Sequence, residues 1–281
     1  MKIGDYEIYP IETGTFWLDG GAMFGVVPKI FWDKTNKSDE LNRVQLAARC
    51  LLIIGNGRNI LMDDGNGTKI TDKFRNIYNL DNNQNDLYKS LAKYNISPND
   101  ITDVILSHLH FDHAGGSTIE EGGVLKLTFP NAKYYVQKIQ WENALNPTER
   151  DRASYIPNDF MPLQKYGVLN LVNGEKELFP GISVLISNGH TPGLQMLKVS
   201  QGGKTLFYPA DLLPFTSHVP LPYIMGFDLQ PLITLEDKRK YLKLAAEEEW
   251  IIFFEHDTKT QAGKIKVTER GYVFDTPVNM N

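Results

Sequence analysis

The 281-residue sequence has a single cysteine, Cys50, and no long apolar run. One cysteine cannot form an internal disulfide, and the apolar, strand-like surroundings of Cys50 favour a buried side chain without redox chemistry. No window reaches the ~20 apolar residues that a membrane span requires. The first residues also contain no apolar stretch of signal-peptide length. We therefore expect a soluble, cytoplasmic protein that does not bind a membrane.

Acidic residues outnumber basic ones, which gives a formal net charge of -5. A nucleic acid held through its phosphates usually needs a basic patch, so the composition argues against a nucleic-acid partner. The chain has neither a short-period repeat nor a low-complexity linker, and its length is sufficient to bury a large core. We therefore expect a single domain over residues 1–281.

Strand-like and helix-like patterns alternate in both halves of the chain. Apolar runs at 48–55 and 103–107 predict buried strands, whereas helical spacing of apolar residues over 234–250 predicts a helix with Thr234 as its N-cap. This alternation predicts an α/β protein with two packed sheets and helices outside them. The stretch 147–174 has weak periodicity and exceeds a typical connection, so we expect either a cover over a functional site or an ordinary surface insertion.

The motif "SHLHFDHAGG", which spans 107–116, brings together three histidines and one aspartate directly after an apolar strand. Residues two apart on a strand point to the same face, so His108 and His110 can converge. A tight turn can then fold Asp112 and His113 back towards them. Imidazole and carboxylate are ligands for borderline and hard divalent ions, and the small residues that end the motif let the backbone pass close to such a centre. The pattern therefore predicts a metal site rather than a set of solvated histidines.

Further segments resemble the metallo-β-lactamase superfamily and follow its motif order over residues 45–260. They are "NILMDDGNG" with Asp63, "NGHTPG" with His190, "YPADLLP" with Asp211 and "FFEHD" with His256. The resemblance implies a four-layer αββα sandwich built from two similar halves. It also implies that Asp63 supports the metal-bearing loop without binding the metal.

The resemblance further implies a binuclear site with a metal-bridging hydroxide. Its implied ligands are His108, His110 and His190 for one ion, Asp112, His113 and His256 for the other, and Asp211 as the bridge. Histidines and aspartates without cysteine suit Zn²⁺, which we favour for its frequency, although Mn²⁺, Fe²⁺ and Co²⁺ accept the same ligands. Two divalent ions, two aspartates and a hydroxide leave a small positive charge, which favours a substrate that becomes anionic in the transition state.

Within this superfamily, the segments 18–29 and 211–231 resemble a branch of N-acyl-homoserine lactone lactonases and methyl parathion hydrolase-like enzymes. The function implied is a quorum-quenching lactonase, and the alternative is a phosphotriesterase or other carboxylic ester hydrolase on the same site. Asp112 would orient the nucleophile and pass a proton to the leaving group. Met23, Phe24 and Val26 are candidates for an apolar wall around the acyl chain, with plain core packing as the alternative.

One position departs from that branch. Several of its lactonases carry a tyrosine three residues after the bridging aspartate, where this chain has Pro214. Either His218 or Tyr223 could replace it. We favour His218 as the catalytic residue, because imidazole chemistry is available near pH 7, and we expect Tyr223 to contact the substrate. The expected partner is a small-molecule ester or lactone, and the apolar residues around "AMFGVVP" and "VPLPYIMGF" are compatible with a homodimer.

Overall fold

The computed structural model describes residues 1–81 and 86–280. Over these residues the framework consists of two seven-stranded sheets. The first sheet has the order β1 (Lys2–Ile3), β2 (Tyr6–Asp19), β3 (Arg43–Gly55), β4 (Arg58–Met62), β5 (Asp103–Ile105), β8 (Lys133–Gln137) and β9 (Leu169–Val172). Strands β4, β5, β8 and β9 run parallel to one another, whereas β1 to β4 are antiparallel.

The second sheet follows the chain order throughout. Its strands are β10 (Lys176–Phe179), β11 (Ile182–Ser187), β12 (Leu194–Gln201), β13 (Lys204–Tyr208), β14 (Ile251–Phe253), β15 (Ala262–Thr268) and β16 (Gly271–Pro277). Only β13 and β14 pair in parallel, because α8 (Pro231–Glu247) lies between them in the chain. A separate hairpin joins β6 (Thr118–Glu121) to β7 (Val124–Leu127).

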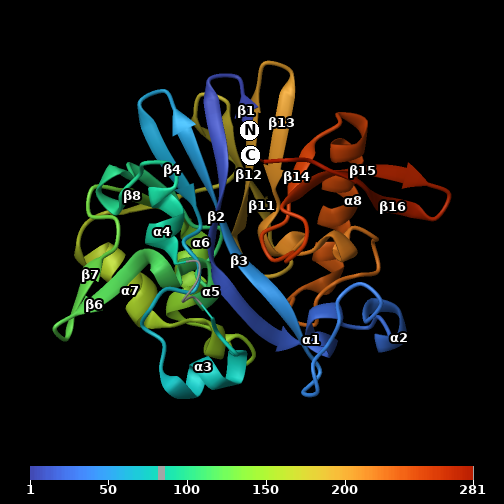
Figure 1. Ribbon diagram of the computed structural model, residues 1–281, viewed down its shortest axis with the longest axis horizontal. Coiled ribbons are helices and arrows are strands. Elements are labelled where there is room, and N and C mark those ends of the chain that lie inside the picture. The colour runs from blue at the N-terminus through green and yellow to red at the C-terminus, as the bar shows by residue number, and fades with distance from the viewer. Residues whose placement is uncertain (82–85, 281) are drawn as a thin grey trace.

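Helices flank the two sheets. The remaining helices are α1 (Gly20–Phe24), α2 (Lys29–Trp32), α3 (Asp72–Tyr78), α4 (Leu87–Ala92), α5 (Phe111–Ala114), α6 (Lys138–Leu145) and α7 (Pro157–Lys165). Short 3₁₀ turns are η1 (Pro98–Asp100), η2 (Gly115–Ser117), η3 (Arg152–Ser154), η4 (Ala210–Leu212) and η5 (Thr216–His218). Figure 1 shows the sheets at the centre, with α4, α6 and α7 on one flank and α8 on the other. The predicted α/β four-layer sandwich is confirmed.

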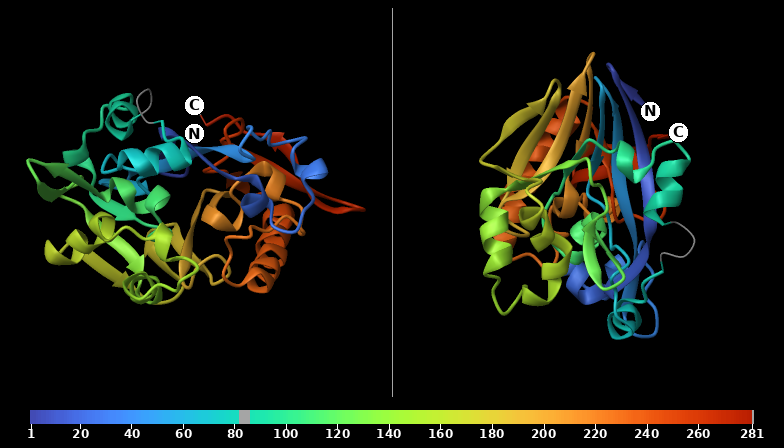
Figure 2. Two further views of the ribbon diagram at one scale, coloured as in Figure 1. Left: turned by 90° about the horizontal axis from the view of Figure 1, so that it is seen from below. Right: turned by 90° about the vertical axis from the view of Figure 1, so that its left-hand side faces the viewer.

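Strand β3 shows why the sequence folds into these layers. Leu51 and Ile53 point into the core between the two sheets, whereas Cys50 and Leu52 point to the core under the helices of the first half. Both faces of the strand are buried, so its sequence is a continuous apolar run instead of an alternating one. Cys50 is a buried, free thiol, as the sequence predicted. The two termini lie close together beside this framework (Figure 2). The Met1 ammonium donates to the Met280 carbonyl over 2.7 Å.

Helix α8 begins four residues earlier than the sequence predicted, because its N-cap is Gln230 and not Thr234. Its first residue is Pro231, which suits a first helical position because proline lacks the N–H that would have no partner there. Thr234 is therefore not an N-cap, and its hydroxyl instead donates to Asp228 over 2.7 Å.

The stretch 147–174 contains helix α7, which the weak periodicity of the sequence concealed. Pro162 lies inside this helix and cannot donate to the carbonyl of Asn158. The hydroxyl of Thr118 donates to that carbonyl over 2.7 Å, so the break in the helical hydrogen bonds is repaired from outside. Among the residues described, no helix is both long and apolar enough to cross a membrane.

Candidate metal centre

The loop that carries the histidine motif is held by Asp63, which follows β4. Strands β4 and β5 are parallel neighbours, so Asp63 and the loop after β5 emerge side by side. The carboxylate of Asp63 accepts hydrogen bonds from the Ser107 backbone N–H over 2.6 Å and from its hydroxyl over 2.7 Å. Asp63 has a φ of 57°, which is uncommon for a residue other than glycine and is often found where function requires a special turn. Asp63 thus supports the motif from behind, as expected.

The same loop packs tightly against the chain that follows Asp63. A side chain at Gly116 would place its Cβ 2.1 Å from the backbone oxygen of Asp64, and one at Gly115 would lie 2.4 Å from that of Asn66. Only glycine allows this approach of two backbones. The paired glycines of the motif are therefore needed to seat the loop.

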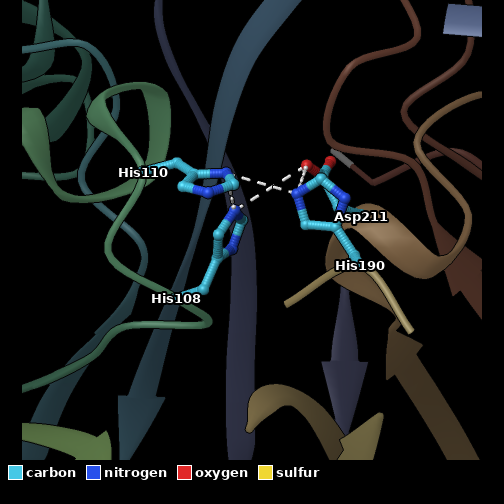
Figure 3. Close-up of side chains that lie close together, drawn as sticks. All are labelled: His108, His110, His190 and Asp211. Carbon is cyan, nitrogen blue, oxygen red and sulfur yellow. Dashed lines mark hydrogen bonds and ion pairs between the residues drawn. The ribbon is translucent and has the colours of Figure 1, made fainter. Parts of the chain in front are cut away.

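A first group of potential metal ligands joins the two halves of the molecule. His108 and His110 come from the loop after β5, and His190 and Asp211 come from the second half (Figure 3). Their donor atoms are close, with 3.0 Å between His108 Nε2 and His110 Nδ1. His190 Nε2 lies 3.2 Å from His110 Nδ1 and 3.0 Å from Asp211 Oδ2.

A second group lies on the other side of Asp211. His256 Nε2 is 3.1 Å from Asp211 Oδ1, and His113 Nε2 is 3.6 Å from Asp211 Oδ2. Asp112 Oδ2 lies 3.5 Å from His113 Nε2 and 3.8 Å from His256 Nε2. Glu255, which the sequence motifs did not single out, also belongs to this group.

Asp211 is therefore the residue that connects the two groups. It lies in the turn η4, directly after β13 and after Ala210, whose φ is 48°. A positive φ at alanine costs about 1–3 kcal/mol and is retained where the surrounding structure demands it. This turn aims the Asp211 carboxylate so that one oxygen faces His190 and the other faces His256.

In three of the histidines, Nδ1 is bonded to another group of the protein. The partners are Asp228 for His190 at 2.9 Å, Asp63 for His113 at 3.1 Å and the carbonyl of Ala47 for His256 at 2.8 Å. A bond at one ring nitrogen fixes the ring orientation and leaves the other nitrogen free to bind a metal. In each of these three histidines the other nitrogen is Nε2, which faces Asp211.

The pKa values of the ligand histidines differ within the centre. Burial acts to lower the pKa values of His113, His190 and His256, but neighbouring carboxylates outweigh it and raise them, so a metal ion that binds these rings displaces protons. Burial lowers the pKa of His110 to about 3 and that of His108 well below its usual range, so both rings are neutral, the form that binds metals. Burial acts to raise the pKa of Asp211, but His190 and His113 outweigh it and hold this pKa well below its usual value. His113 Nε2 and Asp211 Oδ1 are buried and have no hydrogen-bond partner. Metal ions would satisfy such donor atoms.

A cavity of about 260 Å³ opens onto this centre. Its polar side is formed by His110, Asp112, His190, Asp211 and His256, together with Arg150, Asp151 and Ser154. Its other side is largely apolar and consists of Leu18, Ala22, Met23, Leu46, Tyr78, Phe111, Met225, Gly226 and Phe227. The arrangement can present a ligand with a polar head and an apolar tail to the metal centre.

Most of the predicted substrate-binding residues lie outside the lining of this cavity. Met23 lines the cavity, but Val26 is 91% exposed and Phe24 is buried behind the wall. Phe24 stacks on Trp32 at 5.0 Å between ring centroids, and Tyr223 contacts the Phe24 ring edge-on outside the cavity lining. The alternative of core packing therefore holds for Phe24.

His218 is not brought to the cavity either. Its ring is 1% exposed, stacks on Phe24 at 4.8 Å and donates from Nε2 to the Met23 carbonyl over 2.8 Å. Burial lowers the pKa of His218 to about 3, so the ring is neutral. This position gives no support to the predicted catalytic role, because the ring is enclosed by aromatic side chains and does not line the cavity.

The wall residues that the sequence prediction missed come from several separate segments. Phe111 is the one that a sequence signal could have found, because it lies inside the histidine motif itself. Tyr78 ends α3, and Met225 and Phe227 lie between η5 and α8. These side chains meet only in the folded chain, so their sequence positions carry no common pattern.

Comparisons with known proteins give a consistent result. A family model described as the metallo-beta-lactamase superfamily matches residues 44–256. An N-acyl homoserine lactonase from Bacillus thuringiensis is 31% identical over 178 residues, which cover 61% of this chain and 62% of the lactonase. The chain thus matches less than two thirds of that relative's length.

Solved structures extend the likeness to nearly the whole chain. A probable metal-dependent hydrolase from Staphylococcus aureus has a TM-score of 0.89 and 29% identity, covering 99% of this chain and 100% of that chain. AidC, described as a dizinc quorum-quenching lactonase, has a TM-score of 0.82 and 26% identity, covering 100% of this chain and 97% of AidC.

Proposed function

Because the chain belongs to the metallo-beta-lactamase superfamily, we propose that it is a metal-dependent hydrolase that opens N-acyl homoserine lactones. The observation that supports this most is that two groups of potential ligands share Asp211 and adjoin a cavity with an apolar wall. The lactonases among its relatives support the choice of substrate.

Two divalent ions would occupy the centre. His108, His110 and His190 would hold one ion, Asp112, His113 and His256 the other, and Asp211 would bind both. Bound ions of this kind supply a water of lowered pKa as the nucleophile and polarise the carbonyl oxygen under attack. We propose Zn²⁺ because the ligands are imidazoles and carboxylates and because AidC is described as dizinc, while Mn²⁺, Fe²⁺ and Co²⁺ would fit the same donors.

Asp112 would transfer a proton from the attacking water to the oxygen that leaves the lactone carbonyl. Its carboxylate lines the cavity and lies within 4 Å of both His113 and His256, so it borders the reacting atoms. Opening a lactone breaks the bond between the carbonyl carbon and the ring oxygen, which then needs a proton. Asp112 would accept a proton from the attacking water and deliver it to that oxygen.

Tyr78, and not His218, would act in place of the tyrosine that is absent at Pro214. It is a tyrosine of the cavity wall, and its pKa is raised by burial and by the charge of Asp112, which keeps the phenol protonated. A protonated phenol can donate a hydrogen bond to a substrate oxygen. Pro214 has no such donor, so a hydroxyl from another wall would be required.

The remaining walls would bind the rest of the substrate. Met23, Phe111 and Met225 would contact the acyl chain, whose transfer from water to an apolar wall is favourable. Arg150 crosses the rim of the cavity and donates to the Gly226 carbonyl. A guanidinium has five N–H groups, so Arg150 keeps donors for the amide carbonyl of the substrate.

The proposal is tested with a substrate panel at equal metal loading. The purified protein is stripped with a chelator, reloaded with Zn²⁺ or Co²⁺, and offered N-acyl homoserine lactones, a phosphotriester and an aryl ester. We expect lactone opening that is lost on chelation and restored by the ions. A fully metallated protein that leaves every lactone intact and cleaves the phosphotriester or the ester would show that the alternative hydrolase function is the correct one.

A further inference from the structure

Glu255, which precedes His256, turns its side chain into the metal centre. It follows β14, and only 2% of its surface is exposed. Glu255 Oε1 lies 3.6 Å from His256 Nε2, and Glu255 Oε2 lies 3.7 Å from His113 Nδ1. A glutamate that served only solubility would point outwards, so its burial here requires an explanation.

The protein satisfies only one of the two Glu255 oxygens. The hydroxyl of Tyr208 donates to Oε2, whereas Oε1 has no hydrogen-bond partner. Tyr208 also contacts Asp63 Oδ2 at 3.0 Å, and a single hydroxyl hydrogen cannot serve both carboxylates fully.

Nor does a lysine or an arginine compensate the charge of Glu255. Over residues 1–81 and 86–280, the ion pairs of Glu255 are with His113 and His256, and none is with a lysine or arginine. Two further buried carboxylates, Asp63 and Asp211, lie in the same region. Burial of the Glu255 carboxyl without a lysine or arginine raises its pKa to about 8. A bound cation would stabilise the ionised carboxylate in this buried position.

We propose that Glu255 Oε1 is an additional ligand of the ion held by Asp112, His113 and His256. This inference rests on the two-ion centre of the proposed function. The separations support it, because donors bonded to one ion at about 2.1 Å lie between roughly 3 and 4 Å apart. The distance from Glu255 Oε1 to His256 Nε2, 3.6 Å, falls in this range, as does the 3.1 Å from His256 Nε2 to Asp211 Oδ1.

The extra ligand makes the two ion positions chemically different. The first position has three imidazoles and shares one carboxylate, a set that suits Zn²⁺. The second has two imidazoles and a carboxylate from each of Asp112, Asp211 and Glu255, which is an oxygen-rich set with more ligands. Harder ions that accept higher coordination numbers, such as Mn²⁺ and Fe²⁺, are favoured by such a set.

Metal-binding measurements on the full chain test this assignment. Glu255→Gln removes the charge of the ligand and keeps its size, whereas Tyr208→Phe keeps the carboxylate and removes its hydrogen bond. Affinities for the first and second equivalents of Mn²⁺ and Zn²⁺ are measured by competition with a chromophoric chelator. We expect E255Q to weaken the second Mn²⁺ equivalent by about 100-fold and Y208F to weaken it by about 10-fold or less. The visible spectrum of the Co²⁺ protein should change in E255Q alone.

Two results would overturn the assignment. Wild-type affinity for both ions in E255Q would contradict it, and so would equal losses in E255Q and Y208F, because Glu255 would then act only through Tyr208. If E255Q does not fold by circular dichroism, Glu255→Asp replaces it, since the shortened side chain withdraws the oxygen and should give the same loss. The affinities are measured without substrate, so a protein that binds two ions as described but opens no lactone would refute the lactonase proposal alone.

Discussion

The two ligand groups share Asp211 but differ in their chemistry and in their support. The group of His108, His110 and His190 is rich in imidazole, and Asp228 orients it through a hydrogen bond with His190. The group around His256 contains more carboxylates and is backed by Asp63 and Tyr208. Two ions at this centre would therefore not be interchangeable, and changes to one group should be separable from changes to the other.

The largest effect is expected at Asp211, the residue that the two ligand groups share. Asp211→Asn replaces the carboxylate that faces both groups with a weaker, neutral ligand. We expect metal content and lactone kcat/KM to fall together, the latter by roughly 10³-fold, because both ions contribute to the attack. Elemental analysis and initial rates on the same preparation check this. A variant that keeps wild-type activity with one ion bound would refute the two-ion account.

A smaller effect should separate the two groups. Asp228→Asn weakens the bond that orients His190, so we expect the affinity of one ion to fall by about 10–100-fold while the other is retained. Asp237→Asn is the matched control, because Asp237 lies on α8 and bonds Ser187 without contacting a ligand. Chelator competition on both variants gives the comparison. Equal losses of both ions in D228N, or any loss in D237N, would contradict the assignment of Asp228 to one group.

Tyr78 tests whether the cavity wall takes part in the chemistry. Tyr78→Phe keeps the ring and removes the hydroxyl, so we expect kcat for lactone opening to fall by about 10-fold with metal content unchanged. Steady-state kinetics on metal-loaded protein measure this. His218→Gln serves as the comparison, because His218 is enclosed and its variant should leave the pH profile of kcat unaltered. An unchanged kcat in Y78F would exclude the phenol from the reaction.

The smallest effect is expected at the apolar wall. Met225→Ala removes side-chain contact at the cavity, and burial of each methylene contributes about 0.8 kcal/mol. We expect kcat/KM for long acyl chains to fall by a few-fold, with little change for the shortest chain. A series of acyl homoserine lactones of increasing length provides the measurement. A uniform loss across the series would show that Met225 acts on the centre and not on the chain.

The ligands could be predicted from the sequence because their signal is local and ordered. Four of them occur within six residues after an apolar strand, and the others each follow an apolar strand of the second half. The structure brings these residues together, and the binding of ions by them stays a prediction. The α/β fold could be predicted because strand-like and helix-like patterns alternate along both halves of the sequence.

The cavity wall could not be predicted, because it depends on packing between distant segments. His218 lies seven positions after Asp211, yet the stacking of its ring on Phe24 takes it away from the cavity. Val26 was expected in the wall but is exposed, since the chain turns after Gly25, whose φ is 55°. Glu255 was missed because a single glutamate in an apolar run carries no spacing pattern.

The most direct test of the two-ion account is a titration of the metal-free protein with Zn²⁺ in the presence of an N-acyl homoserine lactone. The unequal ligand groups predict that two equivalents bind with different affinities and that lactone opening rises mainly with the second equivalent. Full activity after one equivalent, or two equivalents that bind identically, would contradict the account.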